Sequence, residues 1–324
     1  MKFVCPTCRG ELRRANASAG DEDAWICDPC GKSYPIRDRV VRFLDGGDPF
    51  YEGLFTGTTF IETPYSSMGR LLLSLRIAFS LDMHYTELLR HGLGPEHRRI
   101  LDLGCGGGNY EVVRHGAEVV GVDLSVASLC NAAVVYACAV QASASRLPFP
   151  DGYFDAIVSS NFLGHVLPEE RDAVYSEMQR VLRPGGRMIH QMETSSNGAL
   201  FRFARRDSEY YRKQLIELDG HFGIELPSGA LKRFRDHGFE VERVREDFVW
   251  YFYPAGEANK RFDNEYSKRN IWLRILVRLD KVMEPRPRLR KLWNLTMGIV
   301  NELLCRLTPI DRKIGLRVTL RKRN

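Results

Sequence analysis

The chain has 324 residues, of which 44% are hydrophobic and 27% charged, a composition that excludes a wholly disordered or fibrous protein. No apolar run reaches the roughly 18 residues of a membrane-spanning helix, and the N-terminus lacks the apolar segment of a secretion signal, so we expect a cytoplasmic protein. The net charge of +6 is uneven, because residues 255–324 carry 18 Lys+Arg against 7 Asp+Glu.

Two C-x2-C pairs, separated by eighteen residues, lie near the N-terminus. The four cysteines are Cys5, Cys8, Cys27 and Cys30. Four thiolates at this spacing complete the tetrahedral coordination of Zn²⁺ and leave no position for water or substrate, so the pattern predicts a structural zinc ion. The segment Tyr34–Leu44 completes a resemblance to the zinc-ribbon activator subunits of tRNA and release-factor methyltransferases. We therefore expect a small zinc ribbon over residues 1–45.

The next region separates this ribbon from the rest of the chain. Gly, Asp and Pro gather between Asp45 and Pro49, which predicts a linker. Apolar residues then recur at helical spacing from Met68 to Leu89, and Gly92 is expected to end that helix. We assign residues 46–97 to a linker and a helical cap.

From Arg99 onward, short apolar runs alternate with helical stretches, which predicts a parallel sheet with helices on both faces. The run Ile100–Leu103 leads into a glycine-rich turn, Gly104–Gly108, before an expected helix. Such glycines let the backbone approach a ligand and present amide groups to it. The next strand ends in Asp123, whose carboxylate can bind both ribose hydroxyls of an adenosine cofactor. The G-x-G-x-G spacing disfavours a dinucleotide.

These motifs resemble those of the class I S-adenosylmethionine-dependent methyltransferases. Further segments follow in the family's order: Leu101–Gly108, Leu147–Val158, Arg180–Ile189 and, as a closing antiparallel hairpin, Gly238–Val244 with Phe248–Phe252. The resemblance implies an α/β fold: a Rossmann-like, seven-stranded methyltransferase sheet over residues 98–254, preceded by the zinc ribbon and followed by a helical extension.

The resemblance also implies roles for individual residues. Gly104, Gly106 and Gly108 would line the methionine part of S-adenosyl-L-methionine, Asp123 would hold the ribose, and Asp102 would fix the turn and the methionine amino group. Ser143 stands where many relatives carry an aspartate that binds the adenine amino group, and its neutral hydroxyl predicts a weaker contact. The expected cofactor-binding residues are Asp102, Gly104, Gly106, Gly108, Asp123, Ser143 and Asn161.

The segment Ser159–Pro168 is similar to the one that follows the fourth strand in small-molecule methyltransferases such as those of quinone biosynthesis, with Gly164 in place of a common glutamate. Asn161 and His165 are expected at the mouth of the site. Methyl transfer mainly requires alignment of the acceptor and exclusion of water. Where the acceptor is poorly acidic, His165 is the candidate base; a capping or packing role is its alternative, and His190 and His221 are weaker candidates.

Residues 255–324 lie beyond the resemblance and predict a basic helical extension. Arg274, Arg278 and Lys281 recur beside an apolar face, and a second apolar face runs from Leu292 to Leu307 before a basic tail. Residues 271–323 could therefore contact an anionic membrane, bind RNA phosphates, or pack on the domain with solvated charges.

Taken together, the sequence predicts an S-adenosylmethionine-dependent methyltransferase that contains structural zinc and acts on a small or lipid-linked metabolite. An RNA methyltransferase, in which ribbon and basic tail grip the phosphate backbone, is one alternative. A cofactor-binding activator subunit without its own chemistry is the other. Neither a protein partner nor the oligomeric state is predicted.

Overall fold

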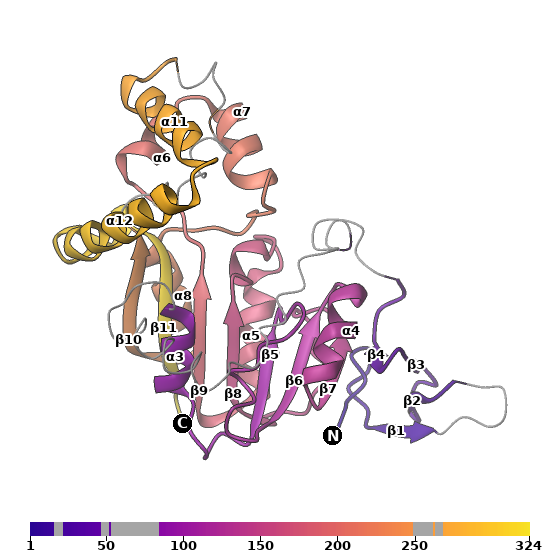
Figure 1. The fold of residues 1–324 in the computed structure, drawn as a ribbon. Coiled ribbons are helices and arrows are strands. Elements are labelled where there is room, and N and C mark those ends of the chain that lie inside the picture. The colour runs from indigo at the N-terminus through magenta and orange to yellow at the C-terminus, as the bar shows by residue number, and fades with distance from the viewer. Residues whose placement is uncertain (16–21, 47–51, 53–83, 249–261, 263–267) are drawn as a thin grey trace.

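The computed structural model describes residues 1–15, 22–46, 52, 84–248, 262 and 268–324. Their strands form one mixed sheet in the order β1-β2-β3-β4-β7-β6-β5-β8-β9-β11-β10 (Figure 1). The central strands are β5 (Arg99–Leu103), β6 (Glu118–Asp123), β7 (Cys138–Gln141), β8 (Phe154–Ser160) and β9 (Leu182–Met192), all parallel to one another.

Helices cover both faces of this central sheet, as predicted. The flanking helices are α3 (His84–Gly92), α4 (Val126–Val135), α5 (Arg171–Val181) and α8 (Pro227–Asp236). Side chains alternate between the faces along each strand: Ile100 packs in one cluster with Leu89 of α3, while Leu101 packs in another with Met178 of α5. This alternation gives the fold two apolar layers, one on each side of the sheet.

The far edge of the sheet differs from the expected closing hairpin. β10 (Phe239–Phe248) pairs in antiparallel fashion with β11 (Ile314–Lys322), which lies between β10 and β9. The second strand of the predicted hairpin, Phe248–Phe252, lies outside the described residues beyond Phe248. The predicted helical extension is therefore helical only in part, because most of its expected basic tail, Arg317 to Arg323, belongs to this strand, in which Arg317 and Thr319 are buried.

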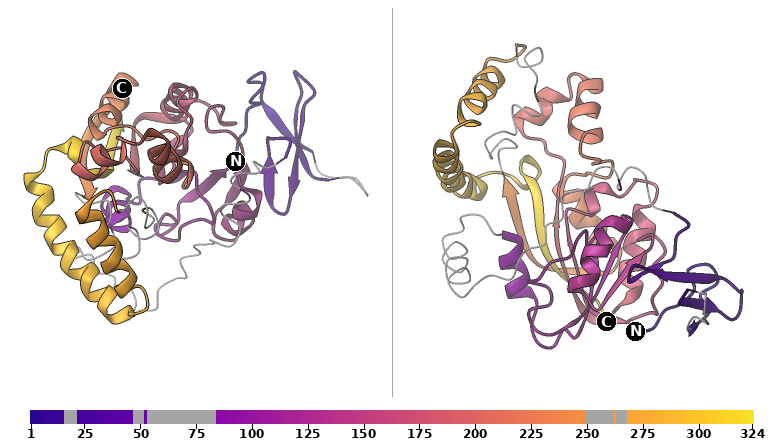
Figure 2. Two further views of the ribbon diagram at one scale, coloured as in Figure 1. Left: turned by 90° about the horizontal axis from the view of Figure 1, so that it is seen from above. Right: turned by 45° about the vertical axis from the view of Figure 1, so that its right-hand side comes forward.

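The sheet has eleven strands among the described residues, not the seven expected, because the N-terminal segment contributes to it. Its strands are β1 (Leu12–Ala15), β2 (Ala24–Cys27), β3 (Ser33–Arg37) and β4 (Val40–Arg42), joined by antiparallel pairing. β4 then pairs in parallel with β7. We call residues 3–43 the N-terminal module; Figures 1 and 2 show it beside β7 at one end of the sheet.

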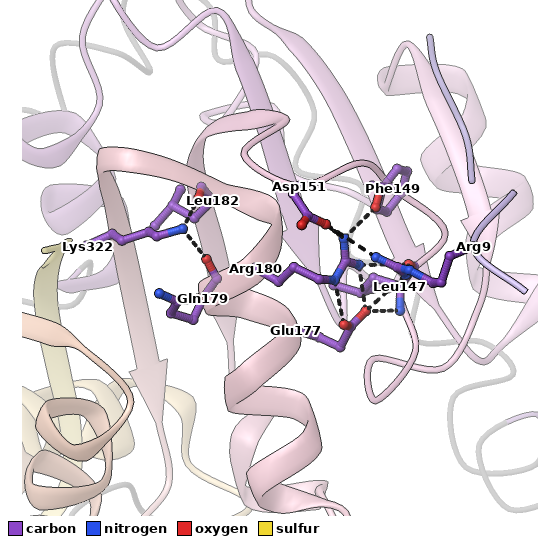
Figure 3. Close-up of polar contacts among 9 residues, drawn as sticks. All are labelled: Arg9, Leu147, Phe149, Asp151, Glu177, Gln179, Arg180, Leu182 and Lys322. Carbon is purple, nitrogen blue, oxygen red and sulfur yellow. Dashed lines mark hydrogen bonds and ion pairs between the residues drawn. The ribbon is translucent and has the colours of Figure 1, made fainter. Parts of the chain in front are cut away.

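The N-terminal module shares a core and hydrogen bonds with the central sheet. Phe3 packs against Phe149 with ring centroids 5.6 Å apart. Arg9 and Arg180 of α5 both donate to Leu147 O, at 3.2 and 3.1 Å, and both reach the carboxylate of Asp151 (Figure 3). The module is thus anchored to the sheet by apolar and charged contacts.

A layer of helices lies beyond the carboxyl ends of the parallel strands (Figure 1). It comprises α6 (Ala199–Ala204), α7 (Ser208–Tyr211), the π-helical η2 (Arg212–Glu217), α11 (Ile271–Met283) and α12 (Pro287–Leu307). Leu273 and Val277 of α11 pack with Phe203 and Tyr210 of the α6–α7 region. We call these elements the cap. It arises from two chain segments, one after β9 and one between β10 and β11.

Both predicted C-terminal helices are present. The side chain of Asn270 accepts from the amides of Trp272 and Leu273 and so starts α11, and Pro287 occupies the first turn of α12. None of the helices in the described part of the chain is long and apolar enough to cross a membrane. The predicted helix from Met68 is described only from His84, because residues 53–83 lie outside the described residues.

Candidate active site

The glycine-rich turn begins where β5 ends and is held against β6. Gly104 N and Cys105 N both donate to Val122 O, at 2.8 and 3.1 Å. Gly104, Gly106 and Gly108 have φ values of +70°, +49° and +89°, a region that glycine adopts without steric cost. A Cβ on Gly106 would meet no atom within 4 Å, so the turn borders open space there.

Asp102 stabilises this turn through a hydrogen bond from the Tyr136 hydroxyl. The Tyr136 hydroxyl donates to Asp102 Oδ2 at 2.5 Å and accepts from Asn109 N at 2.6 Å. Burial raises the pKa of Asp102 to about 7, despite the hydrogen bond from Tyr136. This carboxyl therefore supports the turn, as expected, and is largely shielded from solvent. Its expected contact with the methionine amino group stays a prediction.

Asp123 lies at the end of β6, opposite the glycine turn. Its Oδ2 accepts from Gly106 N at 2.8 Å and its Oδ1 from Ser125 N at 2.9 Å. Burial raises the pKa of Asp123. Since a carboxylate offers about four acceptor sites, these two bonds leave capacity for ribose hydroxyls.

Glu52 also reaches this edge, which the sequence did not indicate. Its carboxylate accepts from Val126 N at 2.6 Å, from Ser125 Oγ at 3.2 Å and from Ala127 N at 3.4 Å. These groups form the first turn of α4, where a negative charge is favoured by the helix dipole. Glu52 thus binds the first turn of α4, next to Asp123.

The segment after β8 brings the other expected residues to the same edge of the sheet. Asn161 is exposed and has a left-handed φ of +53°, and its backbone N–H donates to Gln191 O. Phe162 packs over Gly104, where a Cβ would come within 2.5 Å of its ring. Ser143, just beyond β7, has its hydroxyl 2.7 Å from that of Ser145.

His165 is the last residue of the short helix η1 (Leu163–His165), which follows Phe162. Its Nδ1 donates to Gly220 O at 3.1 Å, which leaves the lone pair on Nε2. Burial lowers the pKa of His165, so the ring is neutral near pH 7. His190, by contrast, is a core residue: it is fully buried, its Nδ1 lies 2.5 Å from Ser159 Oγ, and burial lowers its pKa to about 3.

The four N-terminal cysteines converge, at a distance from this edge. The sulfur atoms of Cys5, Cys8, Cys27 and Cys30 all lie within 4.8 Å of one another, and none is in a disulfide. The sulfur atoms of Cys8 and Cys27 are 3.4 Å apart, and those of Cys5 and Cys30 are 3.6 Å apart. Tetrahedral zinc with Zn–S bonds of about 2.3 Å holds its sulfur atoms about 3.8 Å apart, so this donor set fits the ion.

The residues around the glycine turn fit an adenosine cofactor for two reasons. Gly106 leaves room for a ligand to approach the backbone, and Asp123 presents a carboxylate with spare acceptor sites. Glu52 and Tyr136 were not predicted, because their roles depend on contacts with residues 27 to 75 positions away in the sequence, which no local motif indicates. The strand–glycine pattern predicted the rest of the arrangement. The helix expected after the glycine turn is a wrong prediction, because residues 110–115 form turns between β5 and β6.

Comparison with known proteins identifies the central domain. Residues 101–190 match the family model described as a methyltransferase domain. A methyltransferase of Synechocystis is 36% identical over 126 residues, which cover 38% of this chain and 58% of that protein. The demethylmenaquinone methyltransferase of Mycolicibacterium paratuberculosis is 38% identical over 112 residues, covering 34% of this chain and 47% of that protein.

Among solved structures, phosphoethanolamine N-methyltransferase 2 of Haemonchus contortus in complex with S-adenosyl-L-methionine aligns with a TM-score of 0.45 and 19% identity, covering 85% of this chain and 56% of that one. The sequence matches place a methyltransferase domain at the centre of the chain and confirm that expectation. The chain spans about half the length of the curated relatives it matches.

Proposed function

We propose that the chain is an S-adenosyl-L-methionine-dependent methyltransferase. The observation that carries this proposal is the pairing of the open glycine turn with Asp123 inside the matched methyltransferase domain. The turn accommodates the methionine part, and Asp123 accepts from the ribose hydroxyls. Ser143 and Asn161 flank the adenine and acceptor sides, respectively.

When bound, the cofactor supplies a methyl carbon activated by a sulfonium. The residues of this chain bind and orient the two reactants, which is the main requirement of an in-line displacement. Phe162 closes the space over Gly104, and the cap lies beyond the carboxyl ends of the strands, where it limits access of water. His165 Nε2 is placed to accept a proton from an acceptor hydroxyl.

We further propose that the acceptor is a small or lipid-linked molecule. The support lies in the cap, where α11 exposes one apolar face. Its members are Ile271, Trp272, Ile275, Leu279 and Val282. Arg274, Arg278 and Lys281 lie along one side of this face by helical geometry, and such a combination binds anionic membrane surfaces. A cap held at the membrane would bring the site close to an acceptor in the lipid.

The N-terminal module is proposed to hold one structural zinc ion through its four cysteines. The convergence of four sulfur atoms without a disulfide supports this assignment. Because four thiolates fill a tetrahedral coordination sphere, the ion would stabilise the module without taking part in methyl transfer.

Calorimetric titration with S-adenosylhomocysteine tests the cofactor site. The wild-type chain is expected to bind, and Asp123→Ala to bind about 10- to 100-fold more weakly, as hydrogen bonds to a charged group contribute about 1.5–3 kcal/mol. Asp236→Ala removes an exposed carboxylate far from the site and should bind like the wild type. Absence of binding by the folded wild-type chain would reject the methyltransferase proposal.

A further inference from the structure

A second group of potential metal ligands lies at the acceptor side of the candidate site. His165, Glu193 and His221 each bring a ligand atom within 4.8 Å of the other two. His221 Nε2 is 3.7 Å from Glu193 Oε1, and the two imidazole rings have centroids 5.1 Å apart. A tetrahedral ion bound at about 2.1 Å holds its ligand atoms roughly 3.4 Å apart, so a small inward shift would complete the site.

The three residues come from different elements that converge on one place. His165 follows β8 and Glu193 follows β9, the neighbouring parallel strand. His221 lies in the segment between η2 and α8. Since β8 and β9 end at the same edge of the sheet, the fold itself brings the first two side chains together.

Backbone hydrogen bonds hold the His221 segment against η1. Gly223 N donates to Gly164 O at 2.8 Å, and His165 Nδ1 donates to Gly220 O. Only glycine fits at position 223 in this arrangement, because a Cβ there would lie 1.9 Å from Val166 O. The two histidines are therefore positioned by the fold as well as by their own contacts.

The orientation of His165 is the one found in metal ligands. Metal-bound histidines almost always donate their second ring N–H to a carbonyl or carboxylate, which fixes the ring and directs the other nitrogen at the ion. The bond from Nδ1 to Gly220 O provides this arrangement, and with the ion bound the Nε2 lone pair would coordinate the metal instead of accepting a proton from the acceptor. Gly164 lies directly beside this carboxylate, since a Cβ at this position would be in ordinary contact with Glu193 Oε2, at 3.4 Å.

We propose that His165, Glu193 and His221 bind one divalent transition-metal ion. Two imidazoles and one carboxylate form a donor set that suits zinc and other first-row metals. Three protein ligands leave at least one coordination position open, in contrast to the four cysteines of the N-terminal module.

The next step rests on the proposed function. If the chain transfers a methyl group, the metal site narrows the chemical class of the methyl acceptor. Phe162, three residues before His165, packs on Gly104 of the glycine turn, so the metal would lie on the acceptor side of the methyl donor. The open coordination position would bind an oxygen atom of the acceptor, which favours a hydroxyl- or phenol-bearing molecule.

Metal content measured by mass spectrometry tests the site. Wild type, His165→Ala, Glu193→Gln and the control His91→Ala, which replaces an exposed histidine, are purified with Zn²⁺ and freed of loosely bound ion. We expect His165→Ala and Glu193→Gln to contain about one zinc equivalent per chain fewer than the wild type and the control. The difference is independent of any zinc held by the cysteines. Equal zinc content in all four folded chains would overturn the proposal.

Anomalous diffraction at the zinc absorption edge, from crystals of the wild-type chain, gives a second measurement that needs no variant. A peak between His165, Glu193 and His221 supports the site, and a map with a peak at the cysteines alone refutes it. Titration of His165→Ala with S-adenosylhomocysteine separates the two proposals, because cofactor binding should persist in this variant. Loss of the metal site would then leave the methyltransferase proposal intact.

Discussion

Asp102 carries a proton in the folded chain over a pH range in which the unfolded chain has lost it. Its pKa is raised from 3.8 to about 7 by burial. This carboxyl therefore binds more protons in the folded state between about pH 4 and 7, and its contribution to stability must fall as pH rises through that window. Asp102→Asn keeps an acceptor for Tyr136 but cannot ionise. We expect the variant to gain stability relative to the wild type across this range, by an amount on the order of a few kcal/mol.

Thermal unfolding of the cofactor-free chain at several pH values between 4.5 and 7.5 checks this expectation. Asp236→Asn, an exposed carboxylate paired with Lys232, is the control for general charge effects. Parallel profiles of unfolding temperature against pH for wild type and Asp102→Asn would show that Asp102 does not titrate differently in the two states.

Among individual residues, the sequence predicted those that belong to a local motif and did not predict those whose roles depend on tertiary contacts. Asp123 and the glycine turn follow directly from the apolar strands that precede them and from the glycine spacing, and the structure brings them into contact. Tyr136 and Glu193 carry no such pattern, since each meets its partners only after the strands have paired. The role assigned to each residue in cofactor binding stays a prediction.

Helix α11 presents two different faces, and each has a testable consequence. Leu273 and Val277 are buried against the rest of the cap, whereas Trp272 is 70% exposed and Ile275 41% exposed. We expect the chain to bind vesicles that contain anionic lipid. The double variant Trp272→Asp/Ile275→Asp should lose at least about tenfold in affinity, because it places charge in the exposed apolar face that would enter the membrane. Cosedimentation measures this partitioning.

The matched control is Val134→Asp, which adds a charge at an exposed apolar position of α4, away from the cap. It should bind vesicles like the wild type. Equal partitioning of the wild type and the double variant would contradict the membrane assignment, and strong, salt-sensitive binding to RNA by both would favour nucleic acid instead.

Among the elements, the parallel strands could be predicted because each strand–helix unit carries its own apolar run and turn residues. β11 could not, because its alternating apolar residues are interleaved with Arg317, Arg321 and Lys322 and resemble a solvated tail. In the structure Lys322 Nζ donates to Gln179 O and Leu182 O (Figure 3), so its charge serves an internal contact. Pairing between such distant segments leaves little local signal.

The N-terminal module is continuous with the sheet, and this continuity links its proposed zinc site to the methyltransferase domain. β4 pairs with β7, and Val40 of β4 packs with Leu129 of α4. The same helix begins at Ser125, whose amide binds Asp123. Loss of order in the module would therefore uncover β7 and loosen the elements that position the nucleotide side of the site.

Removal of the zinc ligands is accordingly expected to destabilise the whole chain. Cys30→Ser, or chelation of zinc from the wild type, should lower the temperature of a single cooperative unfolding transition, since a module of about 40 residues that shares its core with the sheet does not unfold alone. Cys130→Ser, a half-buried cysteine outside the cluster, should retain cooperative unfolding close to the wild-type temperature. Calorimetry distinguishes the two cases: a separate early transition in Cys30→Ser, with the main transition unchanged, would show that the module and the methyltransferase domain are energetically independent.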